Sequence, residues 1–264
     1  MRLRYLAPLA LAVSVSGCSL FSSFMNQAMD SAGSEVGHSV GNRVGQALAG
    51  QIQTGLVGPE VTRAYAMALY SVVFYHGGFA WEGKGYQPGD YTVWEGRHVS
   101  QGDRFEKAFL AREADGSEWW RVRADKRSGD HTDQFVAEAL FSKPDASGAQ
   151  KILRMRAQMP GEQKASEVPI TAETQASWVI RPTGHLTAES LAGATVGQEN
   201  VQVPAGTYQA RHVRYSAGTG QADWWLSNDV PGGLVQYGVS SERHGDDDGL
   251  IQLVEVGHNA KPIL

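Results

Sequence analysis

From about residue 80 to its end, the chain alternates apolar and polar residues with a period of two. In the segment KILRMRAQM at 151–159, apolar side chains occupy the odd positions from Leu153 onward and Arg or Gln the even ones. Successive side chains of a β-strand point to opposite faces, so this pattern predicts a sheet with one buried face and one solvated face. In the same way, Trp120, Val122 and Ala124 are predicted to point to one side and Trp119, Arg121 and Arg123 to the other.

Turn-forming residues separate these alternating segments. Gln87-Pro-Gly-Asp precedes the strand-like Tyr91–Trp94, and Ala114-Asp-Gly is typical of a tight hairpin turn between strands at 104–112 and 119–124. Further strands are predicted at 134–141, 151–159, 176–180, 201–215, 221–226, 234–239 and 250–256. Short strands joined by short turns predict a mainly β (α+β) fold. We expect an antiparallel curved sheet or open half-barrel with one or two N-terminal helices.

A helix is predicted ahead of this sheet. Gly58-Pro59 marks a boundary, because proline suits the first turn of a helix. Apolar residues then repeat at helical spacing through Val61, Tyr65 and Leu69, which predicts an amphipathic helix at about 60–70 that covers the core. We therefore place the β domain at 59–264.

The segment 18–58 has an unusual glycine pattern. Glycines recur every fourth residue, at Gly33, Gly37, Gly41 and Gly45, beside an aliphatic register that begins at Val36. On a helix this spacing makes a bare stripe resembling a glycine zipper, where a partner helix or a membrane can approach closely. Each glycine also costs a helix about 1 kcal/mol relative to alanine. Two interpretations stay open: a loosely helical tether, or a helix that packs on an envelope partner or on the protein's own sheet.

The first 18 residues have the pattern of a lipoprotein signal peptide. Arg2 and Arg4 precede an apolar run at 6–15 that is too short to span a bilayer, which needs about 20 residues. Val15-Ser-Gly-Cys18 resembles the lipobox of bacterial lipoproteins, which implies cleavage after residue 17 and acylation of Cys18. An ordinary signal peptide with a chance cysteine is the alternative. In that family, Ser19 after the cysteine implies sorting to the outer membrane, with the protein anchored at its periplasmic face.

Composition narrows the possible partners. The 264 residues carry a formal net charge of −5, which favours neither a nucleic-acid partner nor electrostatic docking on anionic lipid. The only cysteine is Cys18, so acylation would leave no thiol for a disulfide. No later apolar run is long enough to span a membrane, so the acyl chains would be the only membrane attachment.

Three segments carry a resemblance to a known fold family. They are Tyr86-Gln-Pro-Gly-Asp-Tyr, Val203-Pro-Ala-Gly-Thr-Tyr-Gln-Ala and Trp225-Leu-Ser-Asn-Asp-Val-Pro-Gly-Gly-Leu-Val-Gln. In this order they resemble segments of uncharacterised bacterial envelope lipoproteins with a half-barrel domain. That domain is similar to the periplasmic lipoprotein carrier and its outer-membrane acceptor lipoprotein. The resemblance covers about 80–257 and implies an incomplete barrel that encloses an apolar cavity for acyl chains. No ligand residue is transferred from it.

Signatures of catalysis are absent from the sequence. It contains no G-x-S-x-G, H-E-x-x-H or G-x-x-x-x-G-K-[ST] motif, and the histidines show no metal-ligand spacing, so we expect no enzyme, no cofactor and no metal site. The segment His244–Glu255 places oxygen ligands at several positions of a calcium-binding loop. His244 replaces the first aspartate of such a loop, and the flanks have strand patterns, so an acidic β-turn explains the segment more simply.

These observations predict two functions. The first is a non-enzymatic outer-membrane lipoprotein that binds a lipid, an acyl chain or a lipoprotein tail in its half-barrel. One tryptophan of each Trp-Trp pair could line such a cavity, and the expected wall residues are Trp120, Val122, Leu153, Met155 and Trp225. The alternative is a structural or assembly lipoprotein. It would bind another envelope protein through the glycine-rich helix or a sheet edge.

Overall fold

The structure is a computed structural model of the chain. It describes residues 62–63, 66, 69–70, 79–80, 83–97, 102–128, 130–146, 148–172, 175, 179–180, 184–185, 188–217, 220–241 and 249–264. The predicted signal peptide, Cys18, the glycine-rich segment with Gly33, Gly37, Gly41 and Gly45, and the boundary at 58/59 lie outside these residues. They remain predictions.

The described part of the chain is mainly β. Its longer strands are β2 (Tyr91–Gly96), β3 (Arg104–Arg112), β4 (Glu118–Ser128), β5 (His131–Phe141), β6 (Gln150–Gln158), β10 (Thr195–Val203), β11 (Gly206–Ala217), β12 (Gly220–Leu226), β13 (Leu234–Ser241) and β14 (Gly249–Gly257). The two-residue strands are β1 (Phe79–Ala80), β7 (Ser166–Glu167), β8 (Val179–Ile180) and β9 (Gly184–His185), and one helix, α5 (Ala188–Ala194), precedes β10.

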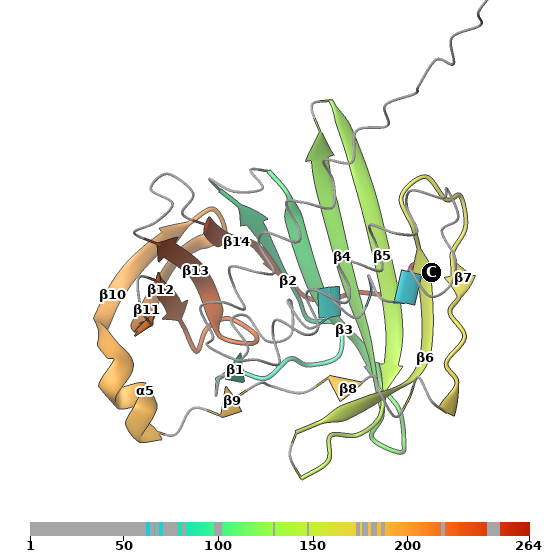
Figure 1. Cartoon of the computed structure of the whole chain (residues 1–264), viewed down its shortest axis with the longest axis horizontal. Coiled ribbons are helices and arrows are strands. Elements are labelled where there is room, and N and C mark those ends of the chain that lie inside the picture. The colour runs from blue at the N-terminus through green and yellow to red at the C-terminus, as the bar shows by residue number, and fades with distance from the viewer. Residues whose placement is uncertain are drawn as a thin grey trace, which may run out of the picture.

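Eleven strands form one open, curved antiparallel sheet in the order β10-β11-β12-β13-β14-β2-β3-β4-β5-β6-β7, and β8 pairs with β6 off this path (Figure 1). The order consists of two meanders, β2–β7 and β10–β14. They join where the last strand of the chain, β14, pairs with β2. The separate pair β1–β9 is parallel. The predicted antiparallel curved sheet is therefore confirmed. Its two halves are joined by the pairing of β14 with β2, strands that are far apart in the sequence.

Strand register defines the two faces of the sheet, because residues directly opposite each other share a face. Trp94 lies opposite Leu253 on one side and Phe105 on the other, and all three are buried. We call the face that carries these residues the inner face. Trp224 and Tyr237, which are opposite each other on β12 and β13, belong to it as well. The opposite face, which carries Glu106, Arg121 and Glu138, we call the outer face.

Helical residues pack against the inner face. Five described residues between 62 and 70 have helical conformation, within the helix predicted at 60–70. Tyr70 is fully buried and meets the ring of Phe141 edge-on at 5.0 Å. Its hydroxyl donates to the carbonyls of Trp120 at 2.8 Å and Ala137 at 3.0 Å. This phenol therefore connects the helical residues to β4 and β5.

Two of the recognised turn motifs meet in the structure. In Val230-Pro-Gly-Gly, Gly232 and Gly233 adopt φ of +75° and +80°, a conformation that glycine takes without strain. The ring of Tyr86 lies so close to Gly232 that a Cβ there would stand 2.8 Å from it. The amide of Gly232 also donates to the carbonyl of Lys84. The 83–86 segment is thus held against the turn between β12 and β13.

Three sequence predictions need correction. The single strand expected at 201–215 is two strands, β10 and β11, joined by a turn at 204–205, and β10 begins at Thr195. The helix α5 occupies a segment for which the sequence predicted no element. In β6, a register shift opposite Leu140 and Phe141 makes Ile152, rather than Leu153, the buried neighbour of Phe141. A β-bulge of this kind changes the face that every following side chain occupies.

Candidate functional site

An aromatic wall lines part of the inner face, over β3 and β4. The register places Phe109 opposite Trp120, and their rings stack with centroids 4.5 Å apart and planes inclined by 13°. Tyr86 meets Trp120 edge-on at 5.3 Å, and its hydroxyl lies 2.5 Å from Oγ1 of Thr92. Each aromatic pair of this kind contributes about 0.5–1.5 kcal/mol beyond the area it buries. The wall is consequently a buried apolar layer whose rings pack against one another.

Lys107 stands within this wall. It occupies the inner-face row of β3 between Phe105 and Phe109, and its strand partner is the fully buried Val122. Its ammonium nitrogen lies 4.8 Å from the ring centre of Tyr86 and 5.0 Å from that of Trp120. Burial lowers the pKa of Lys107 to about 7, and the carboxylate of Glu118 opposes this shift. The ammonium therefore changes charge near neutral pH, on the apolar side of the sheet.

A charged rim borders the aromatic wall at the β3–β4 hairpin. A register shift after Phe109 places Arg112 opposite Glu118, and the two form an ion pair with Nη2 and Oε1 2.8 Å apart. The other oxygen of Glu118 accepts from the indole nitrogen of Trp120 at 3.0 Å. The Arg112 guanidinium lies 5.3 Å from the ring centre of Phe109. Cation–π contacts thus link the rim to the wall.

A second aromatic group belongs to β11–β13. The rings of Trp224 and Tyr237 are 5.2 Å apart, and Tyr215 meets Trp224 edge-on at 5.9 Å. The hydroxyl oxygen of Tyr237 is buried and has no hydrogen-bond partner among the described residues. Burial raises the pKa of Tyr237 far above its ordinary value, so the phenol stays protonated at physiological pH. An unpaired buried hydroxyl costs about 1–3 kcal/mol, which marks this point of the inner face as one that a polar ligand atom would stabilise.

The predicted wall residues divide between the two faces. Trp120, Val122 and Met155 are buried and belong to the core of the inner face. Leu153 is only partly buried, because the bulge in β6 gives its predicted place to Ile152. Trp225 lies on the opposite face from Trp224, where its ring stacks on His212 at 4.5 Å. Of the two adjacent tryptophans, Trp224 is the one that faces the core.

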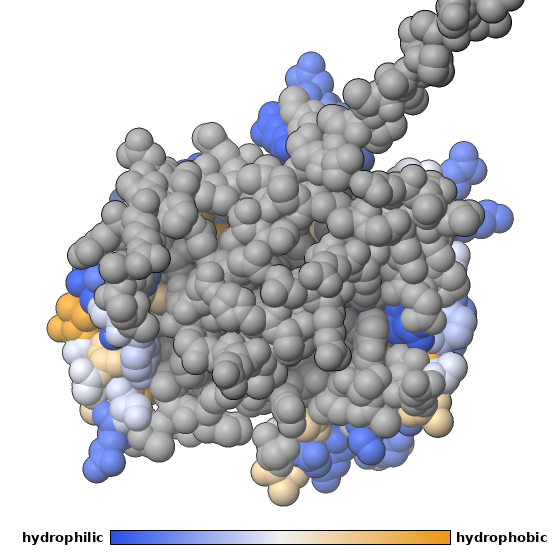
Figure 2. Space-filling model, viewed as in Figure 1, coloured by the Kyte–Doolittle hydropathy of each residue, from blue (hydrophilic) through white to orange (hydrophobic). Residues whose placement is uncertain are grey.

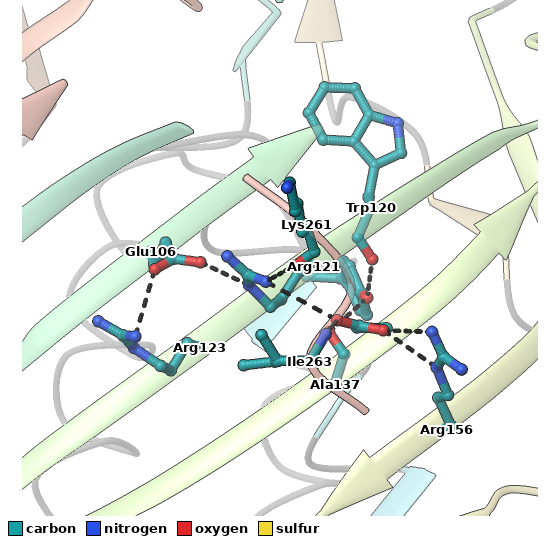
Figure 3. Close-up of polar contacts among 10 residues, drawn as sticks. Glu106, Trp120, Arg121, Arg123, Ala137, Arg156, Lys261 and Ile263 are labelled. Carbon is teal, nitrogen blue, oxygen red and sulfur yellow. Dashed lines mark hydrogen bonds and ion pairs between the residues drawn. The ribbon is translucent and has the colours of Figure 1, made fainter. Parts of the chain in front are cut away.

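A buried charge network crosses the outer face of β3–β6 (Figure 3). Arg121 donates to Glu106 at 2.7 Å and lies 3.8 Å from Glu138. Glu138, whose side chain is fully buried, accepts from Nη2 of Arg156 at 2.6 Å. Arg123 approaches Glu106 at 3.5 Å. Two buried carboxylates and three guanidinium groups therefore satisfy one another, as buried charges must.

The C-terminal residues complete this network. The carbonyl of Lys261 accepts from Nη1 of Arg121 at 2.6 Å, and the amide of Ile263 donates to Oε1 of Glu138 at 2.8 Å. Earlier in the tail, the amide of Ala260 donates to the carbonyl of Gly89 at 2.8 Å. Segments at opposite ends of the β domain are thus fastened together on the outer face. The network has the partners expected of a structural clamp.

A second polar cluster lies on the outer face of β10–β12. Nε2 of His212 is 2.6 Å from Asp223, and its Nδ1 is 3.2 Å from Glu199. Asp223 also accepts from Nε of Arg214 at 2.7 Å, and Glu199 accepts from the indole of Trp225. The carboxylates hold the imidazole ring flat against the indole. These contacts link β10, β11 and β12, so the cluster stabilises their pairing.

The described residues contain neither a cluster of metal-ligating side chains nor a membrane-spanning helix. No three His, Cys, Asp or Glu side chains among them come together as a metal site would require. None of the helices in this part of the chain has the length and apolar character needed to cross a membrane. Of the calcium-loop pattern, the residues before Gly249 lie outside the described part. Its last ligand position, Glu255, accepts a hydrogen bond from the Tyr91 hydroxyl at 2.5 Å.

Neither Lys107 nor Tyr237 was predicted from the sequence as a site residue. A signal for Lys107 was present, because Phe105-Glu-Lys107-Ala-Phe109 puts a lysine in the same row as two phenylalanines. Long lysine side chains often run along apolar surface to reach water, so the pattern alone does not separate the two cases. Tyr237 has no comparable signal, since an unpaired hydroxyl depends on neighbours from distant strands.

Comparison with known proteins gives little further guidance. No protein-family model matches the chain, and no curated protein matches it. Among solved structures, a predicted exported protein with a YmcC-like fold from Bacteroides fragilis is 12% identical, with a TM-score of 0.31, and the match covers 66% of this chain and 98% of that one. A predicted lipoprotein from Parabacteroides distasonis is 10% identical, with the same TM-score, over 66% and 97% of the two chains. A TM-score of this size does not establish a shared fold.

Proposed function

We propose that this chain is a non-enzymatic lipoprotein of the outer membrane, anchored at the periplasmic face through acylated Cys18. In this proposal its curved sheet acts as a half-barrel that binds a lipid or another acyl-chain ligand against its inner face. The observation that carries the proposal is the place of Lys107, a lysine in the aromatic wall of that face.

The chemistry of the wall suits a ligand with an apolar tail and an anionic head. The rings of Phe109 and Trp120 are 0% and 8% exposed and lie in the packed core, so an acyl tail would contact them by displacing the residues that cover them. Burial disfavours the charged form of Lys107, and an anion near its Nζ would favour that form again. A carboxylate or phosphate headgroup supplies such an anion. The proposal therefore predicts that binding raises the protonation of Lys107.

The second aromatic group gives independent support. Tyr237 carries a buried hydroxyl without a partner among the described residues, on the same face as Lys107. Their strands β13 and β3 are separated by β14 and β2, which puts the two residues about 14 Å apart across the strands, at roughly 4.8 Å per strand. The register aligns Tyr237 with Gly96 and Lys107 with Thr92 on β2, which adds an offset of roughly 13 Å along the strands. An acyl ligand is long enough to contact both groups of rings.

The test is titration of the mature protein with a fluorescent fatty acid. We expect saturable binding that K107M weakens about tenfold, while K151M, a change at an exposed lysine of β6, leaves the affinity unchanged. Absence of saturable binding in the wild type would refute the proposal. If K107M and K151M weaken fatty-acid binding equally, the loss of affinity comes from the change in net charge, and Lys107 does not belong to the binding site.

One observation favours the alternative function, assembly with another envelope protein. β10 is an edge strand of nine residues whose only strand partner in the described structure is β11. Figure 2 shows a small hydrophobic spot at its left edge, and this strand carries Val196 at 58% exposure. Exposed edges accept an added strand. If this edge binds a partner, replacing Val196 with Lys should abolish crosslinking to that partner without changing fatty-acid binding.

A further inference from the structure

A polar cleft lies at the end of the β10–β14 meander, separate from the aromatic wall. It has a volume of about 300 Å³ and opens between β10, β11 and the turn that follows β12. Gln198 of β10 lies opposite Arg211 of β11, and Gln209 precedes Arg211 by two residues on the same face of β11. Asn228 and Asp229 come from the turn. All five line the cleft, and their side chains are polar.

Arg211 has unused hydrogen-bonding capacity. Its Nε is buried and has no hydrogen-bond partner among the described residues. Asp229 lines the same cleft, but the two side chains form no ion pair within the described structure. A buried N–H without an acceptor costs about 1–3 kcal/mol, so the fold retains this arrangement at an expense in stability. Protein atoms cover this N–H, so a ligand oxygen would reach it only after the side chain shifts toward the cleft.

The other side chains that line the cleft indicate which kind of ligand would fit beside the Arg211 guanidinium. Gln198, Gln209 and Asn228 are exposed residues, and each carboxamide can both donate and accept a hydrogen bond. Hydroxyl groups of a ligand need partners of this kind. The carboxylate of Asp229 accepts from hydroxyls and disfavours a second negative charge nearby. A volume of about 300 Å³ is at the small end of ligand sites, which suits one sugar ring.

We propose that this cleft binds a small hydroxylated monocarboxylate of the uronic-acid class, with its carboxylate on Arg211 and its hydroxyls on the carboxamides. Nε and one Nη of a guanidinium together match the two oxygens of a carboxylate, a bidentate pairing that an ammonium cannot make. The site does not involve Lys107 or the aromatic wall. It would stand whether or not the inner face binds lipid.

The test is calorimetric titration of the full mature chain, purified in detergent, with glucuronate and with glucose. Glucose has the same ring and lacks the carboxylate. We expect glucuronate to bind at least tenfold more tightly than glucose, and R211Q to lose at least tenfold in glucuronate affinity. The matched control is Q202A, at an exposed position of β10 outside the cleft, which should bind as the wild type does.

Each other result counts against the site. Failure of the wild type to bind glucuronate, equal affinity for glucose, or full affinity in R211Q would overturn the proposal. If R211Q melts well below the wild type, R211K replaces it, since lysine keeps the charge but lacks the bidentate geometry. R211K should still weaken glucuronate binding at least threefold, and unchanged affinity in this variant would also overturn the assignment.

Discussion

Glu138 is the residue whose neutralisation should most affect the stability of the sheet. Its carboxylate is fully buried on the outer face and accepts from Nε and Nη2 of Arg156, at 3.0 and 2.6 Å. It also accepts from the amide of Ile263 at 2.8 Å and lies 3.8 Å from Arg121. E138Q preserves the shape of the side chain but removes its charge. In E138Q, Arg121 would still pair with Glu106, so Arg156 is the guanidinium that loses its carboxylate partner.

The structure sets the size of the effect. Removing one partner of a buried ion pair typically costs about 3–5 kcal/mol, because it leaves the other charge buried without compensation. For a domain of this size, that corresponds to a fall of roughly 6–20 °C in melting temperature. The matched control is E167Q, since Glu167 pairs with Arg154 at the same type of distance, 2.8 Å, but both side chains are about 60% exposed. Exposed pairs contribute about 0–1 kcal/mol.

Urea denaturation followed by tryptophan fluorescence measures both variants against the wild type. We expect E138Q to lower the free energy of unfolding by at least about 3 kcal/mol and E167Q by less than about 1 kcal/mol. Similar small losses in both would show that water or a rearranged tail compensates for Glu138. The outer-face network would then not be a clamp between β4, β5, β6 and the C-terminal residues.

Three other predictions follow from the contacts described. Since burial lowers the pKa of Lys107 to about 7, folded Lys107 binds fewer protons than unfolded lysine between about pH 7 and 10.5, and wild-type stability should rise with pH in that window. We expect K107M to be more stable than the wild type at pH 6 and to lose roughly 2–3 kcal/mol of that advantage by pH 9 in urea denaturation; a constant gap would contradict the pKa shift. G257A should lower the melting temperature, because a Cβ at Gly257 would collide with the ring of Tyr91; an unchanged value would show that the ring moves freely. Y70F removes a buried hydroxyl whose single proton is shared between two carbonyls, and should cost about 1–3 kcal/mol by the same denaturation assay, whereas full stability would mean that Tyr70 contributes through packing alone.

Local pattern was enough to predict the type of fold and much of its inner face. The alternation in 119–124 placed Trp120 and Val122 inside and Arg121 outside, as the structure confirms. The residue types in the 87–90 turn likewise located the start of β2 at Tyr91. These successes rest on chemistry within a few residues of the chain, where a period of two and turn preferences act directly.

Long-range features could not be derived in this way. The pairing of β14 with β2 joins residues about 160 positions apart, and no local pattern encodes it. A β-bulge inserts one extra residue into a strand, and the side chains beyond it then point to the opposite face from the one that strict alternation predicts. The bulge in β6 therefore removes Leu153 from the predicted wall. The place of Trp225 depended on which member of the pair faces the core, and both choices fit the same alternation. The cleft around Arg211 required three separate segments to meet.

Native mass spectrometry of the mature protein purified from the cell envelope tests the proposed function most directly. We expect an extra mass that corresponds to a bound lipid and that is lost or reduced in K107M but retained in K151M. Wild-type protein that carries no lipid, and takes up none when supplied with fatty acid or phospholipid, would contradict ligand binding at the inner face.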